Sequence, residues 1–358
     1  MKKLLSIALA LVIAGATIFT PINVEAASIS KAETLVIAAE KQATALKWQI
    51  SFELTKQVKY PDMKVFNLTK DAYLKAKKEL LNVNAKDRVL LEKRLEANVG
   101  IHYTRAIAYI DAITNGMKMV DKANQFNKQY AADPTAITTE KSYHELSGTI
   151  RKNAMLLYRV YGKTTRDAIL KTYKAPGEKA ILSAQDVITA KMNLNKMNLL
   201  ISAKANKETV ETQVSVFIDS LDAIEDEEII DVLYTAYQTS IRNDSNFIAQ
   251  EKELIEFFTK SDAYYNEEKL EETFGLYSEE YPDYVNLKEG IQSTFEEFDV
   301  VYETLGLEVQ YIIDGTAVVT QDQKATIDQT EEYSFTYTYL IEKDDAGNWK
   351  YLDTLDVY

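Results

Sequence analysis

The stretch from residue 151 to residue 174 holds the side chains whose types and spacing most clearly suggest chemistry. Seven cations stand there against the single acid Asp167, with three tyrosines among them. Guanidinium and ammonium groups bind carboxylate or phosphate, and flat aromatic faces can pack on sugar rings. This combination predicts binding of an anionic polysaccharide by Tyr161 together with Arg151, Lys152, Arg159, Lys163, Arg166, Lys171 and Lys174.

This stretch also allows two other interpretations. Gly162, Lys163 and Thr164 match the end of a phosphate-binding P-loop, but that motif needs a glycine five positions earlier, where Leu157 stands. Alternatively, Gly162 ends one helix, Thr164 caps the next, and the cations are merely solvated. If the helix instead continued through Gly162, four of the cations would share one face, namely Lys152, Arg159, Lys163 and Arg166.

The charge of the chain divides at about residue 207. Residues 28–207 hold 31 Lys and Arg against 17 Asp and Glu, a balance of +14, whereas residues 208–358 hold 8 against 37, a balance of −29. Such a division indicates two modules with different partners. The basic half suits an anionic polymer, which the acidic half would repel.

The N-terminal residues predict export from the cell. Lys2 and Lys3 precede an apolar run, and small residues follow at the positions that signal peptidase reads, so we expect a signal peptide over residues 1–27. No second apolar run is long enough for a membrane helix. The chain has no cysteine for disulfides or a lipid anchor and no wall-sorting tail. We therefore expect a protein secreted to the surface of a Gram-positive bacterium and held there noncovalently. Because nucleic acid is not the expected polymer outside the cell, we do not expect it as a partner.

The sequence offers little for catalysis. The only histidines, His102 and His144, lack the spacing of a zinc site, and Ser147 lacks the glycine pattern of a nucleophile elbow. We predict no catalytic residue, no metal and no cofactor. One enzymatic alternative stays open, a pocket in the C-terminal part that would draw on Asp299, Tyr302, Tyr337, Tyr339 and Asp353.

Helices must position the basic residues. Apolar residues recur at helical spacing from about Ser30 to Ala205, and the first helix should bury a stripe that includes Leu35, Ala38, Ala39, Ala45, Leu46, Ile50 and Leu54. Further helices are expected over residues 69–83, 87–130, 136–161, 164–173 and 178–205. Breaks are expected at Pro61, at Pro134 and at Pro176–Gly177. These lengths are typical of antiparallel helical bundles.

Beyond residue 305 the apolar period changes to two. A hairpin signal at Asp314–Gly315 and the turn at residues 344–348 separate four strands over about 305–313, 316–327, 333–341 and 349–357. Helices before consecutive antiparallel strands indicate an α+β unit with the sheet covered on one face. The predicted fold is therefore multidomain, with all-α helical bundles followed by an α+β unit built on an antiparallel sheet.

The segment RVYGKTTRDAILKTYKA, from Arg159, with RAIAYIDAI at Arg105–Ile113, resembles the N-terminal cell-wall-anchoring region of SbsC-type S-layer proteins. The resemblance covers about residues 30–200. It implies elongated helical bundles that bind a secondary cell-wall polysaccharide noncovalently. That family continues into a long lattice-forming region, which this sequence lacks, so the resemblance does not predict a lattice.

Residues 247–358 are similar to nuclear-transport-factor-two-like domains, a resemblance carried by EEYPDYVNLKEGIQSTFEEFDVVYETL, TAVVTQDQ and KDDAGNWKYLDT. It implies a cone-shaped α+β fold that can hold a small ligand, a protein or a second copy of the chain. We thus expect a signal peptide (1–27), a basic wall-binding domain (28–207), an acidic helical connector (208–246) and the cone (247–358). A passive spacer without any specific ligand is the remaining alternative.

Overall fold

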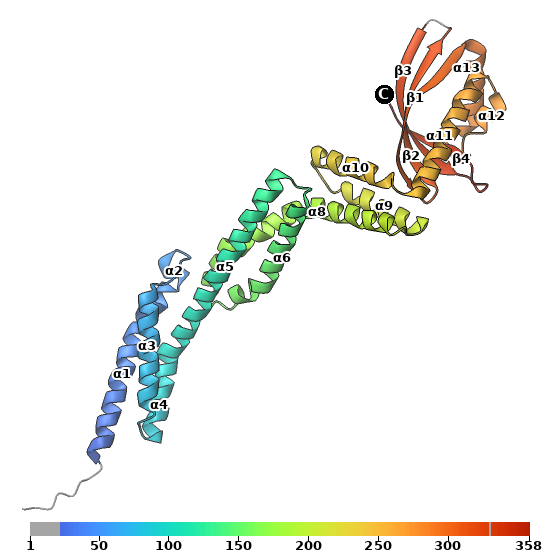
Figure 1. The fold of residues 1–358 in the computed structure, drawn as a ribbon. Coiled ribbons are helices and arrows are strands. Elements are labelled where there is room, and N and C mark those ends of the chain that lie inside the picture. Colours follow the sequence, from blue (N-terminus) through green and yellow to red (C-terminus); the bar gives the residue numbers. More distant parts are fainter. Residues whose placement is uncertain (1–21, 329–330) are drawn as a thin grey trace, which may run out of the picture. The chain divides into compact units, whose positions relative to one another are not determined.

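The computed structural model describes residues 22–328 and 331–358, which form helices up to residue 297 and then a four-stranded antiparallel sheet (Figure 1). The predicted fold class is confirmed. Most of the predicted signal peptide, residues 1–21, lies outside the described residues. The chain folds as two compact units, residues up to 125 with 145–180, and residues 126–144 with 181–358.

The first unit begins with α1 (Ile22–Gln49), which packs against α3 (Met63–Leu80) and α4 (Ala85–Leu95). The short α2 (Phe52–Thr55) follows α1. The fully buried stripe of α1 consists of Ala32, Val36, Ala39, Ala43 and Leu46. The predicted stripe was therefore partly wrong, since Ala38 and Ala45 are exposed. Alanines occur on several faces of this helix, so their spacing alone did not identify the buried face.

A π-helical turn, Glu96–Gly100, joins α4 to the long α5 (Ile101–Ala132), and α6 (Ile137–Tyr158) follows it. The chain then continues through α7 (Lys163–Ile169), a π-helical turn (Leu170–Lys174) and α8 (Ala175–Ser202). The predicted breaks at Pro61 and Pro134 are confirmed.

The predicted break at Pro176–Gly177 is wrong, because the helical path runs from Lys163 to Ser202 without interruption. In the π-helical turn the backbone N–H of Ala175 bonds to the carbonyl of Leu170, five residues back. A wide turn of this kind relieves the contact between a proline ring and the preceding turn, and it tolerates the missing N–H.

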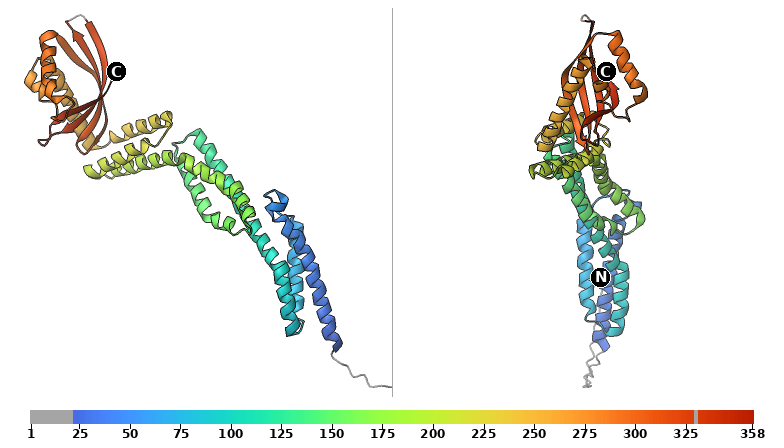
Figure 2. Two further views of the ribbon diagram at one scale, coloured as in Figure 1. Left: turned by 180° about the vertical axis from the view of Figure 1, so that it is seen from behind. Right: turned by 90° about the vertical axis from the view of Figure 1, so that its right-hand side faces the viewer.

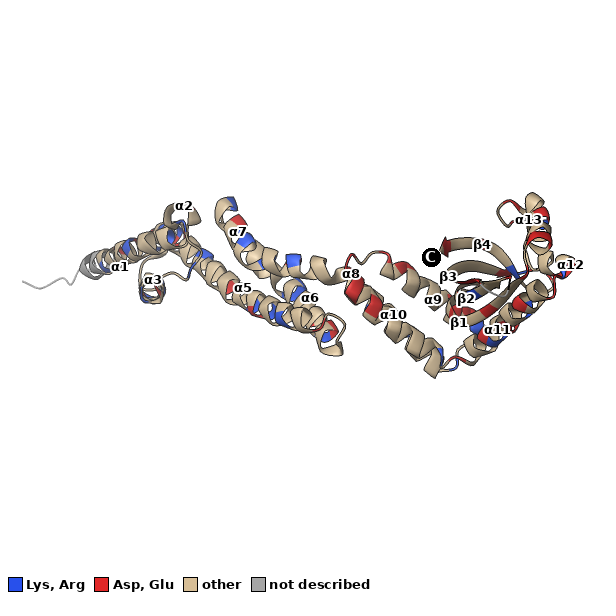
Figure 3. Cartoon of the chain, turned by 90° about the horizontal axis from the view of Figure 1, so that it is seen from above, with Lys and Arg blue, Asp and Glu red and all other residues tan. Residues whose placement is uncertain are grey.

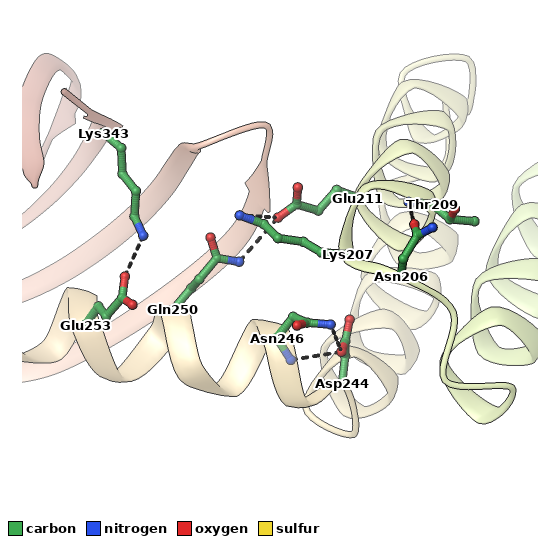
Figure 4. A network of polar contacts seen from close by, with 9 residues as sticks. All are labelled: Asn206, Lys207, Thr209, Glu211, Asp244, Asn246, Gln250, Glu253 and Lys343. Atoms are coloured by element: carbon green, nitrogen blue, oxygen red, sulfur yellow. Dashed lines mark hydrogen bonds and ion pairs between the residues drawn. The ribbon is translucent and has the colours of Figure 1, made fainter. Parts of the chain in front are cut away.

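The second unit contains α9 (Lys207–Leu221), α10 (Glu227–Ile241), α11 (Ser245–Asn266), α12 (Leu270–Phe274) and α13 (Tyr284–Glu297). The side chains of Asn206 and Asp244 cap the N-termini of α9 and α11 (Figure 4). Glu211 of α9 accepts from Gln250 of α11 at 3.3 Å, and Glu253 of α11 pairs with Lys343 of the sheet at 2.6 Å. Polar contacts therefore join α9, α11 and the sheet.

The sheet consists of β1 (Val300–Ile313), β2 (Thr316–Ile327), β3 (Glu331–Lys343) and β4 (Trp349–Val357), antiparallel and in chain order. The predicted hairpin at Asp314–Gly315 is confirmed, with both residues at positive φ as a type I′ turn requires. Register shifts in β1 and between β3 and β4 bend the sheet, and α11 lies along one face (Figure 2).

One hydrophobic core joins the sheet to α9, α10 and α11. Phe217, Leu233 and Tyr237 lie in the same buried cluster as Val309 and Val319 of the sheet. The residues predicted as a connector, 208–246, thus share a core with the C-terminal sheet. The charge boundary at residue 207 differs from the division into packed units, since charge is carried by exposed side chains and packing by buried ones.

Charged side chains are distributed differently along the two parts of the chain. Figure 3 shows Lys and Arg along α6 and α7, and Asp and Glu at the beginning of α10. No helix within the described residues is both long enough and apolar enough to span a membrane.

Candidate functional site

The turn between α6 and α7 interrupts the helical phase. Gly162 has φ of +86°, a conformation that L side chains rarely adopt, and α7 begins at the next residue. The helix therefore does not continue through Gly162. The four cations therefore do not share one helix face, because Lys152 lies on α6 whereas Lys163 and Arg166 lie on α7.

Tyr161, in this turn, is held by a residue of α5. The guanidinium carbon of Arg105 lies 3.1 Å from the centroid of the Tyr161 ring, and Tyr161 is 61% exposed. A cation–π stack of this exposure contributes about 0.5–1 kcal/mol. Arg105 thus has a fixed place, with its charge held against an aromatic face.

A cavity of about 210 Å³ lies next to this stack. It is enclosed by the end of α1, by α2, by α5 and by the turn before α7; its lining residues are Lys47, Ile50, Ser51, Glu53, His102, Arg105, Tyr109, Val160, Tyr161, Gly162 and Thr165. The Thr165 hydroxyl accepts the backbone N–H of Phe52 at 3.1 Å, which ties α2 to α7 beside the cavity. We call this space the Arg105 cavity.

The charges around the Arg105 cavity favour an anion. Lys47 and Arg105 contribute two positive charges and Glu53 one negative charge. Among the residues that the structure describes, no carboxylate lies within ion-pairing distance of Lys47 or Arg105. Burial, together with the charges of Lys47 and Arg105, lowers the pKa of His102. An anion that entered would find two unpaired cations and an imidazole able to take up a proton.

The predicted polymer-binding residues are dispersed over this unit. Tyr161 lines the Arg105 cavity, and Lys152 lines a second cavity of about 660 Å³ between α5 and α6, together with Lys118 and Lys122. The other six line neither cavity: Arg151, Arg159, Lys163, Arg166, Lys171 and Lys174.

Local contacts engage half of these six residues. Lys163 pairs with Asp167 at 2.6 Å, Lys174 pairs with Glu178 at 2.5 Å, and Arg166 donates to the carbonyl of Val160 at 3.3 Å. The others, Arg151, Arg159 and Lys171, are exposed and have no carboxylate within 4 Å in the described part of the chain. They therefore offer charge without a fixed geometry.

Sequence reasoning missed Lys47, His102 and Arg105 as neighbours of Tyr161. Arg105 begins the motif RAIAYIDAI, which pointed to the family resemblance, but nothing in its spacing showed that it would contact a tyrosine 56 positions later. The spacing of His102 and His144 excludes only a zinc site and says nothing about the neighbours of His102. Within the described residues, no cluster of three or more His, Asp or Glu side chains could hold a metal ion.

The segment that contains this site matches a known protein family. Residues 47–178 match the family model described as the SbsC C-terminal domain. An S-layer protein of Geobacillus stearothermophilus is 28% identical over 219 residues, which is 56% of this chain and 17% of that protein. The chain thus spans only a small part of the curated relative that it matches.

Solved structures of SbsC also match. The crystal structure of the N-terminal part of the bacterial S-layer protein SbsC is 16% identical, with a TM-score of 0.44 over 91% of this chain and 71% of that chain. The structure of surface layer protein SbsC, domains 1–6, is 15% identical, with a TM-score of 0.39 over 91% and 41%.

These findings support the predicted resemblance to SbsC-type S-layer proteins. The curated relative that matches is named an S-layer protein, and the matched family model is named for SbsC. The resemblance of residues 247–358 to nuclear-transport-factor-two-like domains stays a prediction.

Proposed function

We propose that this chain is a secreted S-layer-type protein of a Gram-positive cell surface, attached noncovalently to an anionic secondary cell-wall polysaccharide. Its basic helical half would bind the polymer. Its acidic C-terminal module would be displayed as a binding or dimerisation unit, and its charge of −29 over residues 208–358 would be repelled by an anionic wall.

The Arg105 cavity is the observation that carries this proposal. A carboxylate or phosphate on a sugar needs a guanidinium for directed hydrogen bonds, further positive charge and an aromatic face for the ring. Arg105, Lys47 and Tyr161 supply these three at one place. The matched family segment, residues 47–178, contains every residue that lines the cavity.

A small cavity fits one repeat of a polymer better than a free ligand. Its volume of about 210 Å³ is below the roughly 300–1,000 Å³ of sites for drug-sized molecules. We expect one charged sugar residue to enter while the exposed cations Arg151, Arg159 and Lys171 attract neighbouring repeats. Many weak contacts along a polymer then add to a firm attachment.

Sedimentation with wall sacculi tests this proposal. The chain from residue 28 is incubated with native sacculi and with sacculi stripped of their secondary polymer. Binding to native sacculi alone supports a polymer-specific anchor, and equal binding to both, or none, contradicts it.

Three variants locate the attachment. Arg105→Gln removes one of the two positive charges that line the cavity. It should weaken binding about tenfold or more, as expected when a charge-assisted hydrogen bond is lost. Lys70→Gln removes one exposed charge from α3 and is the matched control, which should change binding little. The triple variant Arg159→Ala, Lys163→Ala, Arg166→Ala measures the contribution of the cations in the turn after α6 and on α7. If Lys70→Gln weakens binding as much as Arg105→Gln, the cavity has no special role.

A further inference from the structure

A third cavity, of about 220 Å³, lies in the C-terminal unit between α11 and the inner face of the sheet. Seven of its eleven lining residues are tyrosines, and the others are Ser261, Gln321, Gln323 and Thr354. Every lining side chain therefore carries a hydroxyl or a carboxamide, and none carries a charge or is aliphatic. We call it the tyrosine cavity.

The strand pattern builds one wall of the tyrosine cavity. Alternate residues of a strand point to the same face, so Tyr333, Phe335, Tyr337 and Tyr339 of β3 form a row. Their successive ring centroids lie 6.4, 5.8 and 5.5 Å apart. The row begins at Tyr333, which is 44% exposed, and ends at the cavity, so aromatic faces lead from solvent to the interior.

The neighbouring strand adds amide groups at matching positions. Gln321 of β2 is paired with Tyr337, and Gln323 with Phe335. The Gln321 amide donates to the Thr304 hydroxyl at 2.6 Å, and the Gln323 amide donates to Asp262 at 2.9 Å. Both carboxamides are thereby fixed in orientation, with their positions set by the sheet register.

Hydrogen bonds between lining side chains hold the rest of the cavity, partly between β4 and the segments that face the sheet. The hydroxyls of Tyr265 and Tyr277 lie 2.7 Å apart, and those of Tyr281 and Thr354 lie 2.9 Å apart. The Tyr351 hydroxyl donates to Ser261 at 3.1 Å. These four tyrosines are therefore already satisfied and keep the wall rigid.

Three other tyrosines are not satisfied in this way. The hydroxyls of Tyr302, Tyr337 and Tyr339 have no hydrogen-bond partner in the described part of the chain, although all three line the cavity. Burial raises the pKa of Tyr302 and of Tyr337, so these hydroxyls stay protonated at neutral pH and can both donate and accept.

We propose that the tyrosine cavity binds a neutral saccharide ring, with Tyr337 as the aromatic platform and Tyr302 as a hydrogen-bond partner. Hydroxyls on a sugar match the free hydroxyls and amides, and its C–H faces match the tyrosine rings. The absence of lining cations excludes an anionic sugar, which the acidic module would also repel. The volume, below that of sites for drug-sized ligands, suits a single ring.

This proposal is independent of wall attachment, because all lining residues of the tyrosine cavity belong to the unit that contains residues 181–358. It also refines the enzymatic alternative drawn from the sequence. Tyr302, Tyr337 and Tyr339 do line one cavity, but neither Asp299 nor Asp353 lines it. The cavity therefore offers recognition without a carboxylate for acid or base catalysis.

Saturation-transfer NMR on the chain from residue 28 tests the proposal with defined probes. The neutral probes are the trisaccharides of glucose and of N-acetylglucosamine, and the comparison probes are trigalacturonate and 4-nitrophenol. We expect saturation transfer to at least one neutral trisaccharide and a weaker signal for trigalacturonate.

Variants place the bound sugar. Tyr337→Ala should weaken binding of the neutral trisaccharide about tenfold or more, and Tyr337→Phe, which keeps the ring, should weaken it less. Tyr358→Ala is the matched control, since Tyr358 is 79% exposed and does not line the cavity. Near-ultraviolet circular dichroism verifies that each variant is folded, and Tyr302→Phe provides a second test if Tyr337→Ala is not.

Four results would overturn the proposal. The first is no transfer to any neutral trisaccharide, and the second is transfer to 4-nitrophenol alone, which would indicate an aromatic ligand. The third is equal binding of trigalacturonate and the neutral probes. The last is an unchanged affinity in both Tyr337→Ala and Tyr302→Phe.

Discussion

At the residue scale, the cations of the first unit differ in the groups that they contact. Lys163 and Lys174 each pair with an acid four residues later on the same helical path, Asp167 and Glu178. Arg105 instead lies on the ring of Tyr161 and borders a cavity. A charge without a carboxylate partner gains more from an incoming anion, because no existing pair has to be broken.

His102 gives a testable consequence of this excess of positive charge. Its pKa is lowered, first by burial and then by Lys47 and Arg105, from an ordinary value of 6.5. Because the folded state binds its proton less readily than the unfolded state, the neutral histidine contributes stability above pH 6.5. That contribution is lost as the pH falls through the lowered pKa.

We therefore predict that His102→Gln flattens the loss of stability between about pH 7 and about pH 5. Urea unfolding midpoints measured across this range verify it. Lys47→Gln should act in the same direction, since it removes one of the charges that lower the pKa. Carboxylates with lowered pKa, such as Glu40 and Glu96, titrate below their ordinary value of 4.5 and so fall outside this window. A pH profile of His102→Gln that is identical to the wild type would contradict the prediction.

At the element scale, the π-helical turn at Leu170–Lys174 orients the side chain of Tyr173 toward α5. A Cβ atom added at Gly116 of α5 would lie only 2.5 Å from the Tyr173 ring. Only a glycine allows this approach. Gly177 of α8 is less restricted, because an added Cβ there would lie 3.0 Å from the terminal methyl of Ile150, which can move.

Gly116→Ala should accordingly lower the free energy of unfolding by about 1–3 kcal/mol, the usual cost of overpacking. Gly177→Ala should cost clearly less, and it provides the matched control within the same unit. Urea denaturation of both variants gives the comparison. Equal midpoints would show that the ring of Tyr173 can move away without cost.

The elements of the sheet were predictable because their signals are local. Alternation over residues 333–341 and the turn residues Asp314 and Gly315 specify strands and a hairpin without reference to the rest of the chain. The path through Pro176 was not predictable in this way. Whether a proline ends a helix depends on the turn before it, and the π-helical turn has no clear sequence signature.

At the scale of the whole molecule, salt should weaken binding at the Arg105 cavity but not at the tyrosine cavity. Raising the ionic strength from about 0.1 M to about 1 M shortens the Debye length from about 10 Å to about 3 Å. We predict that sedimentation with sacculi falls steeply over this range while the affinity for the neutral trisaccharide hardly changes. One preparation of the chain measured in both assays makes the comparison direct. Parallel losses in both would show that charge dominates the two sites alike.

The sequence by itself determined the fold class of this protein and the division of its charge between the two halves of the chain. Helical periodicity, strand alternation and turn residues are properties of neighbouring positions, so the helices, the four strands and the α+β sheet could be predicted. Net charge adds up without regard to geometry, so the contrast between +14 for residues 28–207 and −29 for residues 208–358 was also available.

Only the tertiary structure decided which side chains meet. Lys47, His102, Arg105 and Tyr161 come from three separate segments of the chain, and their proximity depends on how α1, α5 and the turn after α6 pack. The same holds for the tyrosine cavity, where alternation predicted the row on β3 but not the facing tyrosines at 265, 277 and 281. The sequence specifies the types of the side chains, whereas the enclosure of a site depends on contacts between residues that lie far apart along the chain.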